Sequence, residues 1–266
     1  MLVNYFDYRL VSGDNKKLAN HILEALENVG YIIVQNFDVD VNNAENSGKK
    51  FLEISNMVGN TINHAGHNSI IWDIKSNPKS NSFVKTYSEH SHEAELHTDS
   101  QYSLYPEDYF GLLTLKKANC GGGISYLLSL KEILNELRAL PNGSIHEKTL
   151  SNTNFPFIIP NVFKKNASVE HEFNFGPILR ENEIRFRVDT FEKALSIKRD
   201  LCDEEQMEAY HALKKIILKT SKTQMLFLQP KDLIFINNKT MLHGRGEFTD
   251  ADRHLLRIRM NKKSNL

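Results

Sequence analysis

The stretch Leu96-His97-Thr98-Asp99 (LHTD) holds a histidine and an aspartate two positions apart. Alternate side chains of a β-strand share a face, so on a strand this spacing brings an imidazole and a carboxylate side by side. A second stretch, Leu242–Arg245 (LHGR), supplies His243 after an expected strand at 232–236. Two imidazoles and one carboxylate can hold iron on one face and leave three coordination positions open. We therefore predict a metal centre formed by His97, Asp99 and His243.

The pairing of histidine and aspartate is a weak signal by itself, because the chain has 11 histidines and such pairs also occur as buried hydrogen-bonded couples. His90 and His92 have the same spacing and are a rival source of ligands. No aspartate follows them, so we expect a polar loop at the mouth of a pocket, with His92 contacting substrate. Gly121–Gly123 lacks the lysine and hydroxyl residue of a phosphate-binding loop, which argues against a nucleotide site.

Upstream of this region, the chain reads as helix, strand, helix. Residues 14–29 place apolar side chains on one helical face, with Asp14 as the cap. Residues 31–35 (YIIVQ) are typical of a buried strand, and a second helix is expected at about 42–58.

After residue 60 the pattern changes to short β-like runs separated by turn residues, which favours an all-β sandwich or barrel core. The expected strands are 69–74, 82–87, 109–117, 124–128, 183–188, 224–228, 232–236 and 255–260. Two helices interrupt them, opening at the capping boxes Ser129-x-x-Glu132 and Asp203-x-x-Gln206. Residues 141–182 show the least pattern and are a candidate mobile lid.

Composition narrows the class of protein. Lys+Arg and Asp+Glu both number 33, so no basic excess points to nucleic acid. Two cysteines, Cys120 and Cys202, make neither a disulfide framework nor a zinc cluster. Residues 1–10 do not read as a signal peptide, and no apolar stretch approaches the roughly 18 residues of a membrane helix. We expect one domain over residues 1–266, located in the cytoplasm and not in a membrane.

Several motifs occur in an order that resembles the Fe(II)/2-oxoglutarate oxygenases of the taurine dioxygenase and clavaminate synthase type. The resemblance spans roughly residues 30–260. The matching segments are Gly30–Val34 with Asn36-Phe37, Leu96–Asp99, Gly122–Ser125, Asn237–Arg245 with Phe248, and Asp252–Arg257.

This resemblance implies a mainly β fold, a double-stranded β-helix (jelly-roll) core with flanking helices. It implies that His97, Asp99 and His243 bind Fe(II). It also implies that Arg253 holds the distal carboxylate of 2-oxoglutarate, for which a guanidinium offers a planar fork. Ser125 stands where many relatives have a threonine that reaches the same co-substrate. Arg257 is a second candidate for the main clamp, and the sequence leaves the choice open.

The resemblance implies oxidation of an unactivated C–H bond with O2, releasing succinate and CO2. Because halogenating relatives replace the carboxylate ligand with a small residue, the presence of Asp99 favours hydroxylation, desaturation or ring formation. Arg257, His92 and Arg187 are the candidate substrate-binding residues. The guanidinium groups of Arg257, Arg185 and Arg187 could meet a carboxylate, which favours a small-molecule substrate, an amino acid or a derivative of one. Arg185 and Arg187 would share one face of the strand expected at 183–188, for which a solvated face is an equally good interpretation.

Two other classes stay open at this point. One is a non-enzymatic jelly-roll binding module with a buried histidine–aspartate couple, and the other is a different metal enzyme, such as an isomerase or a hydrolase, on the same barrel. A binding module would leave His243 and Arg253 as coincidences, and another metal enzyme would not require an arginine to hold a dicarboxylate. Self-association into a homo-oligomer is also left open.

Overall fold

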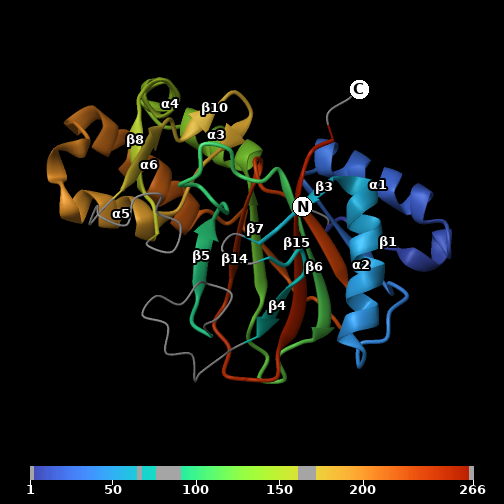
Figure 1. The fold of residues 1–266 in the computed structure, drawn as a ribbon. Coiled ribbons are helices and arrows are strands. Elements are labelled where there is room, and N and C mark those ends of the chain that lie inside the picture. Colours follow the sequence, from blue (N-terminus) through green and yellow to red (C-terminus); the bar gives the residue numbers. More distant parts are fainter. Residues whose placement is uncertain (1–2, 65–67, 76–90, 161–171, 264–266) are drawn as a thin grey trace.

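The computed structural model describes residues 3–64, 68–75, 91–160 and 172–263. Its centre is a pair of β-sheets packed face to face (Figure 1). The larger sheet has seven strands, in the order β1-β2-β13-β6-β15-β3 with β4 also paired to β15. These strands are β1 Tyr5–Asp7, β2 Tyr31–Gln35, β13 Leu233–Asn237, β6 Tyr109–Lys116, β15 His254–Asn261, β3 Asn60–Ile62 and β4 Trp72–Lys75.

The smaller sheet has four strands, in the order β12-β7-β14-β5, and all its pairs are antiparallel. Its strands are β12 Gln224–Leu226, β7 Ser125–Ser129, β14 Met241–Arg245 and β5 Ala94–His97. Two short hairpins lie outside both sheets, formed by β8 Phe155–Ile158 with β9 Phe173–Gly176 and by β10 Leu179–Arg180 with β11 Glu183–Ile184.

Alternation along β2 shows how one strand supports two layers. Tyr31 and Ile33 are buried between the sheets, in a cluster with Met241 of β14. Ile32 and Val34 point the other way and are buried against helices. An uninterrupted apolar strand is therefore covered on both faces, as its sequence predicts.

Helices flank the sheets on two sides (Figure 1). Those of the described segments are α1 Asn15–Asn28, α2 Ala44–Val58, α3 Leu130–Arg138, α4 Gly143–Asn152, α5 Val188–Ile197 and α6 Glu204–Lys219, with short 3-10 turns at Tyr8–Val11 and Arg199–Leu201. The first two cover the outer face of the larger sheet, and the other four form a second apolar cluster with β7 and β14. No helix in the described ranges is both long and apolar enough to cross a bilayer.

The expected helix starts are confirmed where a side chain caps the helix. Asp14 accepts a hydrogen bond from the Lys17 backbone nitrogen at the start of α1 (2.9 Å). Asp203 and Gln206 form the full capping box of α6, and Ser129 accepts from the Glu132 nitrogen at α3. The mainly β core with flanking helices is thus the fold that the sequence predicts.

Three local predictions need correction. The strand expected at 183–188 is wrong beyond Ile184, because α5 begins at Val188 and buries an amphipathic face there. The segment 141–182 is not irregular in its described parts, which hold α4 and the β8–β9 and β10 strands. Only two helices were expected after residue 60, whereas the described residues there form four. Expected strand 82–87, like residues 161–171 of the candidate lid, lies outside the described residues.

Candidate metal centre and co-substrate pocket

Strand pairing brings the two predicted histidine ligands together. His97 is the last residue of β5, and His243 lies in the middle of β14. The two residues are directly opposite in the antiparallel ladder, and their ring centroids are 4.3 Å apart. The side chains of such a cross-strand pair lie on the same face of the sheet. Two segments far apart in sequence therefore present adjacent imidazoles.

Asp99 completes the group from outside the strand. Its Oδ1 lies 3.8 Å from His97 Nε2, and its Oδ2 lies 3.5 Å from His243 Nε2. One donor atom from each of the three residues lies within 4.8 Å of the others. The expectation that His97 and Asp99 share a strand face is wrong, because β5 ends at His97 and the chain turns through Ser100 with a positive φ of 49°.

The protonation of both imidazoles suits metal binding. His97 Nδ1 lies 2.7 Å from the Glu95 carbonyl, which can only accept, so Nδ1 carries the proton and Nε2 is left as a donor to metal. Burial lowers the pKa of His97 well below its usual value and that of His243 to about 3. Both rings are therefore neutral near pH 7, the form that ligates a metal. The donor set of two imidazoles and one carboxylate fits Fe(II).

Arg257 lies beside this group. Its guanidinium contacts the Asp99 carboxylate, and its partly buried side chain lies over the Phe110 ring, with the guanidinium carbon 4.7 Å from the ring centroid. The same Phe110 ring packs against His243, with centroids 4.5 Å apart. The carboxylate of the group thus has a positive neighbour within the protein, and an apolar wall limits water around it.

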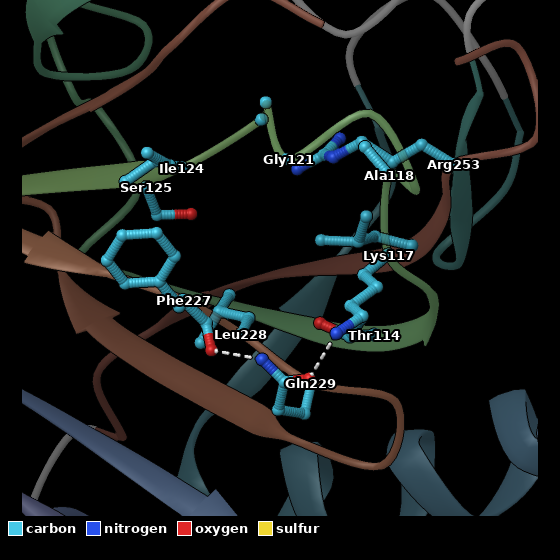
Figure 2. Close-up of a pocket in the computed structure, with 13 residues that line it drawn as sticks. Thr114, Lys117, Ala118, Gly121, Ile124, Ser125, Phe227, Leu228, Gln229 and Arg253 are labelled. Carbon is cyan, nitrogen blue, oxygen red and sulfur yellow. Dashed lines mark hydrogen bonds between the residues drawn. The ribbon is translucent and has the colours of Figure 1, made fainter.

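A cavity lies at the start of β15, where Arg253 precedes the strand. It is lined by Arg253, Ser125, Thr114 and the glycine loop 121–123, and Figure 2 shows Ser125 and Arg253 at its edge. Lys117 lies lower in the same view, where it donates a hydrogen bond to Gln229 (2.7 Å).

The glycine loop packs directly on Arg253. A Cβ on Gly123, whose φ is +72°, would lie 3.1 Å from Arg253 Nε, and one on Gly122 would lie 2.3 Å from the Glu247 carbonyl oxygen. The glycines therefore permit close approach of the backbone to this arginine.

Arg253 has no carboxylate partner among the described residues, although it is only 6% exposed. Its charged neighbour is Arg245, and burial with this repulsion lowers the pKa of Arg253 to about 10. A buried guanidinium without a counter-charge is costly, so the cavity suits an anionic ligand that supplies one.

The remaining predicted residues lie in different settings. His92 is exposed, and its backbone carbonyl accepts a hydrogen bond from Arg245 Nη2 (2.6 Å). His90, which with His92 formed the alternative pair of candidate ligands, lies outside the described residues. Arg187 is the N-cap residue of α5 and forms a forked pair with Asp189, with nitrogen–oxygen distances of 2.6 and 2.8 Å. Both charges of this pair act on the pKa of His97, so the pair lies close to the metal group.

Arg185 does not share a strand face with Arg187, contrary to expectation. Its Nε donates to the Gln101 carbonyl (3.0 Å), and its guanidinium stacks over Phe157. It anchors the chain after Asp99 from within the core. The sequence analysis did not identify Asp189 as a neighbour of His97, because it expected no helix at 188–197.

A family model describes the chain over nearly its whole length. The model of the taurine catabolism dioxygenase TauD, TfdA family matches residues 3–259. The chain belongs to this family. The predicted iron- and 2-oxoglutarate-dependent dioxygenase activity, with Fe(II), 2-oxoglutarate and O2 as its cofactors and co-substrates, is thereby confirmed.

Solved structures with this TauD/TfdA fold are similar to the chain throughout. The structure of asparagine oxygenase with Fe(II), 2S,3S-3-hydroxyasparagine and succinate is 16% identical, with a TM-score of 0.73 over 92% of this chain and 79% of that one. The non-haem iron oxygenase OrfP with iron, succinate and (3S)-hydroxy-L-Arg is 19% identical, with a TM-score of 0.69 over 96% of this chain and 81% of that one. OrfP is also solved with iron and alpha-ketoglutaric acid. These likenesses show the fold, and no curated protein matches the sequence.

Proposed function

We propose that this protein hydroxylates a free amino acid or a small amino-acid derivative, with Fe(II) held by His97, Asp99 and His243. The convergence of these three side chains from distant segments is the observation that carries the proposal. The bound iron would supply oxidation of an unactivated C–H bond with O2, while 2-oxoglutarate is converted to succinate and CO2.

The co-substrate would bind between the metal group and the cavity at Arg253. Its distal carboxylate would pair with the Arg253 guanidinium, and the Ser125 hydroxyl would donate a hydrogen bond to it. None of the described residues places a carboxylate at Arg253, and this supports the proposed orientation of the co-substrate, because a bound carboxylate would offset the cost of burying the cation. Arg257 then lies at the other end, beside Asp99.

The substrate class is supported by charges near the metal group. Arg257 offers a carboxylate site, while Arg187 and Asp189 offer both signs of charge near His97. An amino acid carries one carboxylate and one ammonium group, so it can pair with both a positive and a negative side chain. The similar structures of asparagine oxygenase and OrfP hold hydroxylated amino acids, which points the same way. Contact between substrate and His92, a cytoplasmic location and the oligomeric state stay predictions.

A substrate screen tests this proposal. The purified protein with Fe(II), ascorbate and 2-oxoglutarate would be mixed with each common amino acid and a set of derivatives, and succinate and hydroxylated product would be measured. We expect substrate-dependent succinate from at least one of them and none from Asp99→Ala. Equal product from Asp99→Ala would overturn the ligand assignment, and turnover only with substrates that are not amino acids would overturn the substrate class.

A further inference from the structure

The carboxylate of the metal group lacks the support that holds the histidines. His97 and His243 lie in paired strands, but Asp99 follows the end of β5 and precedes the positive-φ residue Ser100. Thr98 is tied to Phe186 by a backbone hydrogen bond of 2.8 Å. A side chain from another segment ties down the Asp99 backbone itself.

Asn238 provides this support through its carboxamide. Its Oδ1 accepts a hydrogen bond from the Asp99 nitrogen (2.8 Å), and its Nδ2 donates to the Asp99 carbonyl (3.2 Å) and to the Glu107 carbonyl (2.9 Å). The amide thus pairs with both backbone groups of Asp99, as a neighbouring strand would. It is 1% exposed, so water does not compete for these bonds.

The position of Asn238 links it to a second candidate ligand. It follows β13 directly, and its backbone nitrogen donates to the Asp108 carbonyl (2.8 Å). The β13–β14 hairpin therefore carries both His243 and the amide that holds Asp99. We propose that Asn238 is a positioning residue for Asp99 and that it sets the affinity of the site for its divalent metal; this inference rests on the proposed function.

The chemistry requires asparagine at this position. Alanine removes all three hydrogen bonds and leaves buried backbone groups of Asp99 and Glu107 unpaired. Aspartate keeps nearly the same shape and can still accept from the Asp99 nitrogen. It presents oxygen, however, to two carbonyl oxygens that need a donor. Asn238→Asp therefore removes the donor function with little change in volume.

A matched control is available in the adjacent residue. Asn237 is also buried, but its side chain accepts from the Lys239 nitrogen (3.0 Å) and donates to the Leu26 carbonyl (3.3 Å), away from Asp99. Asn237→Ala therefore loses buried hydrogen bonds in the same turn without releasing Asp99.

The test is anaerobic titration of wild type, Asn238→Ala, Asn238→Asp and Asn237→Ala with Co(II), followed by the visible absorption of the bound ion. We expect wild type and Asn237→Ala to bind alike, and both Asn238 variants to bind about 10- to 100-fold more weakly with an altered spectrum. Far-UV circular dichroism and thermal unfolding identify the folded variants, and Asn238→Asp carries the test if Asn238→Ala does not fold.

Three results separate the explanations. Wild-type affinity and spectrum in a folded Asn238 variant would overturn the inference. Equal weakening in Asn237→Ala would also overturn it, because the effect would then be general to the turn. Failure of wild type to bind Co(II) would instead contradict the proposed metal site. In an Asp99→Ala background, the further loss from Asn238→Asp should shrink, since the amide acts through Asp99.

Discussion

The metal end and the glycine-loop end of the site differ in how their arginines are neutralised. Arg257, within β15, contacts the Asp99 carboxylate, so its charge is balanced by the protein. Arg253, four residues earlier, is buried and lines a cavity that has no carboxylate from the described residues. We therefore propose different ligands for the two arginines: Arg253 would bind the dianionic co-substrate, whereas Arg257 would contact the substrate beside the metal group.

Among the variants that test this difference between the arginines, replacement of Arg253 should change a kinetic constant most. In Arg253→Met the forked partner of the distal carboxylate is lost, so we expect KM for 2-oxoglutarate to rise about 100-fold. KM for the amino-acid substrate should change far less. Steady-state succinate formation at varied 2-oxoglutarate measures this. An unchanged KM for 2-oxoglutarate would show that the clamp lies elsewhere.

The reciprocal change at Arg257 sharpens the contrast. Arg257→Lys keeps a positive charge near Asp99 but loses the planar fork, so we expect KM for the substrate to rise about 10-fold. KM for 2-oxoglutarate should stay within about threefold of wild type, because Arg253 is the proposed partner of the co-substrate and is unchanged. The same assay with both ligands varied gives the two values. If KM for 2-oxoglutarate rose more in Arg257→Lys than in Arg253→Met, Arg257 would be the main clamp for the co-substrate, contrary to the proposal.

Ser125 tests the glycine-loop end on a finer scale. Ser125→Ala removes one neutral hydroxyl, and loss of such a hydrogen bond weakens 2-oxoglutarate binding by about 3- to 10-fold. Ser125→Thr keeps the hydroxyl and is the matched control, with binding expected near wild type. Equal losses in both variants would point to packing and not to the hydroxyl.

The smallest effect concerns pH at the metal end. Burial holds the pKa of His243 near 3 in the folded protein, and that of His97 is also lowered. The unfolded chain takes up protons below about pH 6.5 that the folded chain does not, so stability falls as pH drops from 6.5 toward 3. At one unit below 6.5, each such histidine costs about 1 kcal/mol.

Urea unfolding of metal-free protein at pH 7.5 and 5.5 measures this loss. His243→Gln should lose less stability between the two pH values than wild type. The same loss in both proteins would place the titration in other groups.

The sequence identified three side chains that the structure brings together, but it did not predict how they are brought together. The strands around His97 and His243 follow from short apolar runs, but their direct pairing depends on a register between segments far apart in sequence. Asp99 was expected on the strand, whereas a turn and the distant Asn238 place it. The local sequence around Asp99 does not indicate a contact with Asn238, because that contact depends on tertiary packing. The wrong placement of Asp99 on a strand therefore has a physical cause.

The same limit explains Arg187 and the two arginines of the site. Val188–Ile197 mixes β-branched and helix-forming residues, and burial of Phe191 and Ala194 decides for a helix. Arg187 thus became a helix cap paired with Asp189 and not a strand residue. Arg253 and Arg257 could not be distinguished, since their difference lies in the glycine loop and Asp99 that tertiary packing brings to them.

Visible absorption of the anaerobic protein with Fe(II) and 2-oxoglutarate tests the central claim most directly. Chelation of iron by the keto-acid end should give a weak charge-transfer band in wild type. The same band should need a much higher concentration of 2-oxoglutarate in Arg253→Met and should be absent in His243→Ala. A wild-type protein that binds Fe(II) and 2-oxoglutarate but shows no band, or an undiminished band in His243→Ala, would contradict the account.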